Sequence, residues 1–250
     1  MQNSETIKKK EWFGEWFNSP YYHILYKHRD YNEARVFIDN LVKYFDFQKD
    51  HKIQDLACGK GRHSIYLNEK GFDVVGVDLS AKNIEHAQQF ENDRLHFHIH
   101  DMREVFQEES FDFILNLFTS FGYFDSAKEN EKAICSAAKG LKPGGKLLID
   151  FLNTYTVVHN LVPCEEKLID GIEFKITKRL SDDGFILKDI EFEDQGKQYR
   201  FQEKVKAIRK VDFLHCFEKA KLKLEGVFGD YNLNPYDEKH SDRMIFVVQK

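Results

Sequence analysis

The stretch DLACGKGRHS, residues 55–64, decides the fold of this chain. It ends an apolar run at residues 52–57, and two closely spaced glycines, Gly59 and Gly61, follow in a tight turn. Glycine lets the backbone turn sharply and lets a ligand approach the main chain. A helix is predicted to begin near Arg62, with its free N–H groups toward the same ligand. We therefore predict a strand, a turn and a helix that hold a cofactor containing a nucleoside.

Strands and helices alternate along the chain from residue 51 onward. Apolar runs predict strands at 52–57, 73–78, 95–100, 111–118 and 145–151. The segments between them predict helices near 61–70, 81–92 and 126–140. Repeated strand–helix units imply a parallel sheet that helices cover on both faces.

The pattern changes after Asn153, where apolar and polar residues begin to alternate. This alternation predicts an antiparallel meander at 171–178, 185–193 and 198–208. A helix at 211–221 and two strands at 222–229 and 243–249 complete the chain. The predicted organisation is an aromatic N-terminal arm or lid (1–30), a main domain (31–153 and 209–250) and a β insertion (154–208). The insertion is expected to be a substrate lid or a dimer contact.

Composition narrows the class of protein. The 250 residues fit one α/β domain with an insertion, and the net charge of −5 argues against a nucleic-acid partner. No apolar run approaches the roughly 20 residues of a membrane span, and the polar N-terminus lacks a signal core. Four widely spaced cysteines indicate neither a zinc cluster nor a disulfide framework. We expect a cytoplasmic protein without a membrane partner, as a monomer or a homodimer.

Three kinds of cofactor compete for the glycine turn. A P-loop requires GxxxxGK[ST], which is absent. A dinucleotide fingerprint requires a third glycine where Ser64 stands, so that match is partial. S-adenosylmethionine has no pyrophosphate but carries a sulfonium and an ammonium, and Asp55 near the end of the first strand suits that cationic side. The turn therefore favours S-adenosylmethionine and leaves a nicotinamide dinucleotide as the alternative.

Acidic residues end three consecutive predicted strands. Asp78 follows Gly59 by 19 residues, a spacing that lets a carboxylate accept both ribose hydroxyls. Asp101 ends the next strand, where it could accept a proton from an adenine amine. With Asp55, these acids lie at the edge where open α/β sheets bind ligands. Alternatively each acid caps the following helix, but three in register with the glycine turn weigh against that interpretation.

At this point the chain resembles the class I S-adenosylmethionine-dependent methyltransferases of the small-molecule type. The resemblance covers about residues 45–152 and is carried by DLACGKG, VVGVDLS, HDM, FDFILNLFTSFGYF and LKPGGKLLIDF, with RMIFVVQK at the end of the chain. Ala57 replaces the usual first glycine. The resemblance implies a Rossmann-like doubly wound sheet of about seven strands, mostly parallel with an antiparallel last strand, plus the small antiparallel β insertion.

The resemblance also implies roles for matched positions. The backbone of Ala57, Gly59 and Gly61 would line the methionine portion of the cofactor, and Asn116 and Leu117 would offer carbonyls there. Asp78 would bind ribose, Leu79 would pack on adenine, and Asp101 with Met102 would hold the adenine edge. In the aromatic arm the candidates are Tyr21, Tyr22, Tyr26 and Arg29, with Arg29 pairing with the cofactor carboxylate.

The implied activity is transfer of a methyl group from S-adenosylmethionine to a small-molecule acceptor by in-line displacement. Ser120 and Tyr123, just after the fourth strand, are candidates near the methyl group, although such a transfer requires no catalytic triad. A nicotinamide-dependent oxidoreductase and a catalytically silent S-adenosylmethionine-binding module are the alternatives. His96, His98 and His100 share one strand face and could ligate zinc. Outward polar residues are normal on an edge strand, so no metal is predicted.

Overall fold

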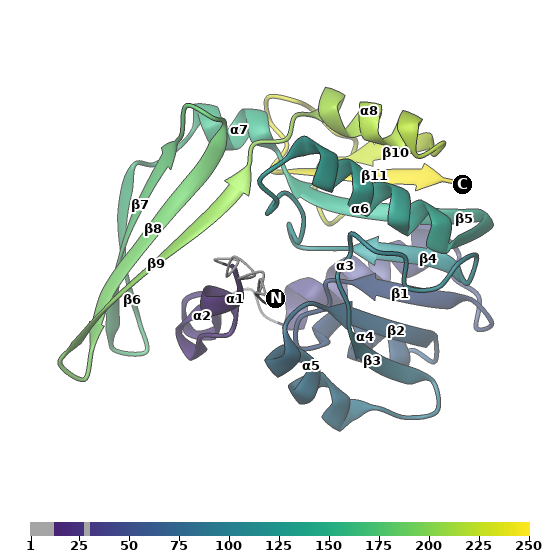
Figure 1. Ribbon diagram of the computed structural model, residues 1–250, viewed down its shortest axis with the longest axis horizontal. Coiled ribbons are helices and arrows are strands. Elements are labelled where there is room, and N and C mark those ends of the chain that lie inside the picture. The colour runs from purple at the N-terminus through teal and green to yellow at the C-terminus, as the bar shows by residue number, and fades with distance from the viewer. Residues whose placement is uncertain (1–12, 28–30) are drawn as a thin grey trace, which may run out of the picture.

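The computed structural model describes residues 13–27 and 31–250, which fold around two separate β-sheets (Figure 1). The larger sheet has seven strands in the order β10-β11-β5-β4-β1-β2-β3. Its strands are β1 Lys52–Leu56, β2 Asp73–Asp78, β3 Leu95–Ile99, β4 Phe111–Asn116, β5 Leu141–Leu152, β10 Lys223–Phe228 and β11 Arg243–Gln249. Strands β1 to β5 are parallel, and β11 runs antiparallel to both of its neighbours.

Helices cover both faces of the seven-stranded sheet, and the strands alternate their apolar side chains between the two layers. One face packs against α6 Ala127–Gly140 and α8 Lys210–Lys219, and the other against α3 Tyr31–Tyr44, α4 Arg62–Glu69 and α5 Ala81–Ala87, which the short 3-10 helix Gln88–Phe90 extends. In β11, for example, Phe246 belongs to the first layer and Val247 to the second. The doubly wound sheet predicted from the sequence is confirmed.

Local sequence signals fix where several helices begin. Ser126 caps α6 in a capping box with Glu129, and Ser80 accepts the Asn83 N–H at the start of α5. The first two helices, α1 Phe13–Phe17 and α2 Pro20–Leu25, are separated by Ser19, which caps α2 ahead of Pro20. These caps set where α2, α5 and α6 begin.

The second sheet is an antiparallel meander of four strands, β6 Cys164–Ile169, β7 Ile172–Leu180, β8 Phe185–Asp194 and β9 Lys197–Lys206. The sequence predicted the last three strands and missed β6 and the short helix α7 Thr154–His159 that precedes it. β6 was missed because charged residues make up half of it, so its apolar alternation is weak. The insertion predicted at 154–208 is therefore a four-stranded sheet with a leading helix.

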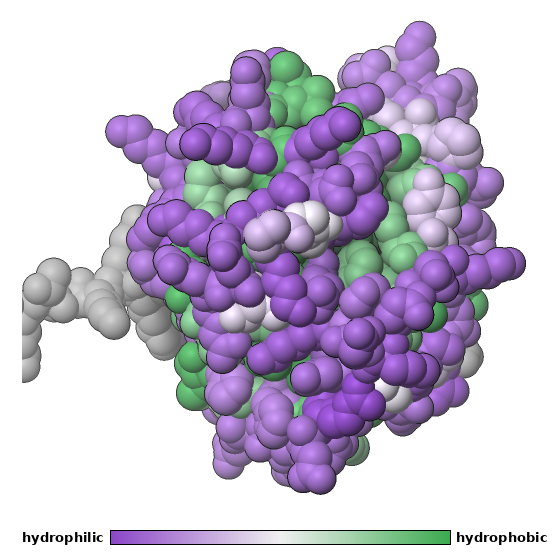
Figure 2. Space-filling view, turned by 90° about the vertical axis from the view of Figure 1, so that its right-hand side faces the viewer, coloured by the Kyte–Doolittle hydropathy of each residue, from purple (hydrophilic) through white to green (hydrophobic). Residues whose placement is uncertain are grey.

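Helices α1 and α2 lie between the two sheets (Figure 1). Trp16 and Leu25 are buried against the apolar face of the four-stranded sheet, together with Phe174 and Ile190. Figure 2 views the end of the molecule away from that sheet, where hydrophilic residues cover most of the surface. No helix in residues 13–27 and 31–250 is both long and apolar enough to cross a membrane.

Candidate functional site

A cavity of about 650 Å³ opens at the carboxyl ends of β1, β2 and β4. Its floor comes from the turns after these strands, and its roof comes from α1 and α2. Parallel α/β sheets bind ligands at this edge, because the strand order reverses there and leaves a crevice. The cavity therefore lies where the sequence predicted a cofactor.

The glycine turn after β1 shapes the floor of the cavity. Ala57, Gly59 and Gly61 all have left-handed backbones, with φ of 66°, 58° and 83°. The N–H groups of Ala57 and Cys58 both donate to the Val77 carbonyl, which folds the turn against β2. A Cβ on Gly59 would meet no atom within 4 Å, whereas one on Gly61 would lie 2.7 Å from the Phe97 ring. Gly59 thus leaves free space on the cavity wall, and Gly61 is required for packing beneath it.

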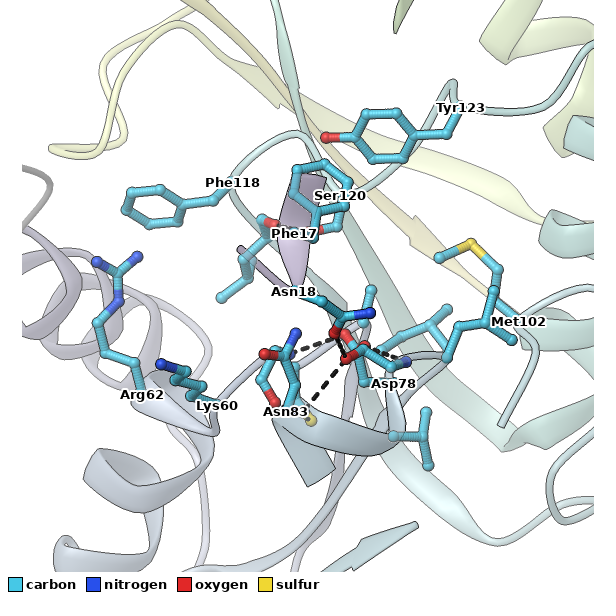
Figure 3. A pocket seen from close by; sticks show the side chains of 18 of the residues that line it. Phe17, Asn18, Lys60, Arg62, Asp78, Asn83, Met102, Phe118, Ser120 and Tyr123 are labelled. Carbon is cyan, nitrogen blue, oxygen red and sulfur yellow. Dashed lines mark hydrogen bonds between the residues drawn. The ribbon is translucent and has the colours of Figure 1, made fainter. Parts of the chain in front are cut away.

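Asp78 lies in the middle of the cavity wall, between Lys60 and Arg62 on one side and Met102 on the other (Figure 3). One of its oxygens accepts the Gly59 N–H at 2.9 Å, and the other accepts the Ser80 N–H at 2.8 Å. Burial raises the pKa of the Asp78 carboxyl, and these backbone donors partly oppose the shift. The Asn83 side chain also donates to this carboxylate, which keeps acceptor capacity that a ligand can use.

Asp101 lies on the same wall but is held by a neighbour. The Arg103 side chain donates to both of its oxygens, at 3.0 Å and 2.6 Å, and also pairs with Glu129 at 2.7 Å. Burial alone would raise the pKa of Asp101, but the Arg103 hydrogen bonds outweigh burial and lower it. The carboxylate therefore stays charged and in a fixed orientation beside Met102.

Positively charged and imidazole groups gather at the opposite end of the cavity, where α4 begins. Burial lowers the pKa of the Lys60 ammonium. The Arg62 guanidinium lies 4.6 Å from the centre of the Phe118 ring. His63 is buried, and burial together with the charge of Arg62 lowers its pKa to about 3, so it is neutral at physiological pH. This end of the cavity suits a negatively charged ligand group.

The roof supplies mainly aromatic side chains. Phe17 makes edge contacts with Tyr22 and Tyr123, with ring centres 5.1 Å and 5.4 Å apart. Asn18 accepts a hydrogen bond from Ser80, which joins the roof to the start of α5. The cavity is thus polar along its floor and aromatic under its roof.

Residues 53–145 match the family model of a methyltransferase domain. The chain contains a methyltransferase domain. This match, with the motifs and the sheet order, confirms the resemblance to the class I S-adenosylmethionine-dependent methyltransferases. The methyltransferase domain begins in β1 and ends early in β5, so it includes the glycine turn, Asp78 and Asp101.

Relatives of the chain cover different parts of it. It is 31% identical over 185 residues to the glycine/sarcosine N-methyltransferase of Aphanothece halophytica, which covers 67% of this chain and 64% of that protein. It is also 31% identical over 96 residues to the dTDP-3-amino-3,4,6-trideoxy-alpha-D-glucopyranose N,N-dimethyltransferase of Streptomyces venezuelae, covering 38% and 40%. The chain therefore spans less than two thirds of the length of either relative.

A solved structure extends the likeness of fold over nearly the whole chain. The S-adenosylmethionine-dependent methyltransferase from Clostridium acetobutylicum superposes with a TM-score of 0.76 at 21% identity. The superposition covers 92% of this chain and 95% of that structure, so the four-stranded insertion falls largely within the shared fold.

Most of the predicted site residues lie on the cavity wall. They are Tyr22, Ala57, Gly59, Asp78, Leu79, Asp101, Met102, Leu117, Ser120 and Tyr123. Tyr26 lies there too, whereas Tyr21 packs on Phe192 and Tyr199 of the four-stranded sheet. Arg29 lies outside the described residues.

Three predicted contacts are not on the cavity wall. Gly61 packs against the Phe97 ring, which leaves no room for a Cβ at this position. Asn116 is buried, and its side-chain amide donates to the Leu56 carbonyl at 2.9 Å. Asp55 is 1% exposed and accepts the Ser64 hydroxyl at 2.6 Å, so it serves the start of α4, which has no side-chain cap of its own. For Asp55 the helix-capping interpretation is the one the structure supports.

Sequence reasoning missed other residues of the wall, notably Phe17, Asn18, His23, His63 and Phe118. His63 is the second residue of α4 and lies within the stretch quoted at the start, directly after the glycine turn. That position was the available signal. Of the three histidines considered as zinc ligands, His96 and His98 lie on β3 and His100 follows it. His98 and His100 pack against Phe106, and no cluster in the described part of the chain has three or more metal-ligating side chains suitably placed.

Asp55 predicts a pH dependence of folding. Burial raises its pKa to about 6, although Ser64 donates to the carboxylate. The native state then holds a proton that the unfolded state has lost between about pH 4 and about pH 6, so the stability contributed by this group falls as pH rises through that window. As pH rises from about 4 to about 6, the free energy of unfolding of the neutral Asp55→Asn variant should increase by up to about 3 kcal/mol relative to that of the wild type. Urea unfolding at several pH values measures this gain, and parallel curves for the two proteins would contradict it.

Proposed function

We propose that this chain transfers a methyl group from S-adenosylmethionine to a small-molecule amine. The observation that carries the proposal is the roofed cavity centred on Asp78. Its volume lies within the range of small-ligand pockets, and its floor matches the chemistry of the cofactor from end to end. The relatives that methylate glycine, sarcosine and an amino sugar support an amine as the acceptor.

The proposed orientation of the cofactor follows from the residues that line the cavity. The Asp78 carboxylate would accept the ribose hydroxyls. Leu79 is apolar, 45% exposed and on the wall, so it offers a surface for the adenine next to Asp101 and Met102. Lys60 and Arg62 would face the carboxylate at the amino-acid end, above the open space at Gly59. When bound, S-adenosylmethionine supplies an activated methyl group.

The acceptor would lie under the aromatic roof, beside Ser120 and Tyr123. The Ser120 hydroxyl donates to the Leu117 carbonyl at 2.8 Å, and the Tyr123 hydroxyl donates to the Thr119 carbonyl at 2.6 Å. Because both hydrogens are committed to the backbone, the two oxygens offer lone pairs to the cavity. Lone pairs of this kind would accept the N–H groups of an amine and orient its nitrogen. A neutral amine attacks through its own lone pair and needs no prior deprotonation.

The arm and the insertion would together form the lid. Glu203 on β9 accepts the Trp16 indole N–H at 2.6 Å and the Tyr26 hydroxyl at 2.7 Å. Tyr21 donates to Asp194 at 2.8 Å. The roof helices are thus fastened to the four-stranded sheet, and their closure over the cavity would exclude water from the reacting groups.

Other features of the chain agree with the predicted setting. The four cysteines are free, which fits a reducing compartment such as the cytoplasm. The choice between monomer and homodimer stays a prediction. The family model and the relatives are methyltransferases, so the nicotinamide alternative is not carried further.

Ligand binding followed by turnover tests the proposed function. Calorimetry should detect S-adenosylhomocysteine binding and no NAD binding. Incubation with S-adenosylmethionine labelled in the methyl group should then transfer label to at least one member of a panel of glycine, sarcosine and nucleotide-linked amino sugars. Binding of NAD in place of S-adenosylhomocysteine would overturn the cofactor assignment. Tight cofactor binding with label transferred only to hydroxyl compounds would overturn the amine assignment.

A further inference from the structure

The loop after β4, residues 117–124, has an unusual backbone. Phe118 and Thr119 are consecutive residues with φ of 59° and 58°, in the left-handed region. Neither is glycine, and a side chain that branches at Cβ, as in Thr119, makes this conformation especially unfavourable. Such a conformation persists only where the surrounding structure holds it in place. The contacts around these two residues identify what holds them.

The two backbone N–H groups of this turn donate to one residue of β5. Asp150 is fully buried, and its carboxylate accepts the Phe118 N–H at 2.8 Å. Its backbone carbonyl accepts the Thr119 N–H at 3.0 Å. A single residue thus satisfies both donors and fixes the direction in which the chain leaves β4.

Arg243, the first residue of β11, completes the support. Its guanidinium donates to the other oxygen of the Asp150 carboxylate at 2.7 Å and to the Thr119 hydroxyl at 2.7 Å. The charge of Asp150 outweighs the effect of burial and raises the pKa of Arg243. A buried ion pair is a weak source of stability, because desolvating the two charges opposes their attraction. Its value here lies in the geometry that it imposes on the loop.

Tyr231 adds a third contact from the long connection between β10 and β11. Its ring stacks on Phe118 with centres 5.2 Å apart and planes 24° apart, and its hydroxyl donates to Asp150 at 3.2 Å. On its other side Phe118 contacts Arg62 and His63 of α4. Phe118 therefore joins the loop after β4 to the end of the cavity where the charged groups of α4 lie.

The loop carries the acceptor side of the cavity. Ser120 and Tyr123, which would border the acceptor, both line it, and their hydroxyls donate to carbonyls of the same loop. Asp150 and Arg243 do not line the cavity themselves. We propose that Asp150 and Arg243 are positioning residues, which hold the loop after β4 in its left-handed form so that the acceptor wall exists before any ligand binds. This inference rests on the proposed function for the meaning of that wall.

Hydrogen exchange in the free protein tests the positioning role. In Asp150→Asn, which keeps the side-chain shape, amides of residues 117–124 should exchange about tenfold faster, because local opening no longer breaks an ion pair. Arg243→Met should give the same local change, and Arg243→Lys, which keeps the charge, should give a smaller one. The double variant should exchange no faster than either single variant, since the pair acts as a unit.

Asp112→Asn is the matched control. Asp112 lies at the opposite end of β4, where its carboxylate accepts the Lys52 N–H at 2.8 Å and pairs with Lys142 at 2.7 Å. Its replacement should leave exchange in residues 117–124 unchanged. If the buried variants fail to fold, Thr119→Val removes the hydroxyl that Arg243 reaches, keeps the branching at Cβ, and should still speed exchange in the loop. Unchanged loop exchange, or an equal rise throughout the seven-stranded sheet, would overturn the proposal.

Binding and turnover separate this proposal from the proposed function. S-adenosylhomocysteine should bind Asp150→Asn within about threefold of its wild-type affinity, since the ribose contact is untouched. With an acceptor found in the panel, turnover at saturating cofactor should fall far more than cofactor affinity does. Failure of the wild type to bind S-adenosylhomocysteine would overturn the proposed function and leave the exchange result standing. A loss of cofactor affinity as large as the loss of turnover would overturn the assignment to the acceptor side.

Discussion

Replacing Asp78 with asparagine is expected to weaken S-adenosylhomocysteine binding by about 30- to 100-fold, or about 2–3 kcal/mol. The carboxylate would accept the ribose hydroxyls, and hydrogen bonds to a charged acceptor are among the strong ones. The same carboxylate accepts the Gly59 N–H, so the variant would also loosen the glycine turn. Calorimetry at neutral pH measures the loss.

Two comparisons give the Asp78 result a specific meaning. Asp73→Asn changes the same type of side chain at the other end of β2, away from the cavity, and should leave affinity unchanged. Methylthioadenosine contains the ribose and lacks the amino-acid end, so Asp78→Asn should weaken its binding by a similar factor. A variant that loses S-adenosylhomocysteine but keeps methylthioadenosine would show that Asp78 does not bind the ribose.

Alanine at Gly61 should unfold the protein far more readily than alanine at Gly59. At position 61 a Cβ would lie 2.7 Å from the Phe97 ring. The alanine would also have to adopt a φ of 83°. Overpacking and left-handed strain together predict a loss of about 2–5 kcal/mol in the free energy of unfolding. At Gly59 the new Cβ meets open space, so only strain remains, about 1–2 kcal/mol. Chemical denaturation compares the two variants.

Ligand binding should rank these two glycine variants in the opposite order. The Cβ of Gly59→Ala would project into space that the cofactor requires, so S-adenosylhomocysteine affinity should fall at least about tenfold in protein that is still folded. Gly61→Ala should bind nearly normally in whatever fraction stays folded, because Gly61 is not on the cavity wall. Normal binding by Gly59→Ala would place the cofactor away from the turn.

Much of the fold could be predicted because its signals are local. The apolar runs of β1 and β2, the glycines between them and Asp78 at a strand end all lie within one strand–helix–strand unit. The position of Asp55 away from the cavity wall also has a local cause. Successive residues of a strand face opposite sides, and Asp55 shares a face with Ile53, which packs in the layer beneath α3, α4 and α5. The side chain of Asp55 therefore points toward α4 and away from the cavity.

The roof could not be predicted, because its contacts join distant parts of the chain. Trp16 and Tyr26 meet Glu203 across more than 170 residues. Apolar spacing shows that residues 13–25 have something to bury, and alternation shows that β7 and β8 have an apolar face, but neither pattern identifies the partner. The left-handed backbone of Phe118 and Thr119 could not be predicted either, because Asp150 and Arg243, which hold it, lie far along the chain.

The shared core of the roof limits how the roof could be exchanged between related proteins. Trp16 and Leu25 are buried against Phe174 and Ile190, so residues 13–27 and 164–206 hold each other's shape. Moving one segment into another enzyme would leave its apolar face uncovered and would present a mismatched surface to the substrate. The two segments are separated by more than a hundred residues of sequence. They would therefore have to be transferred together.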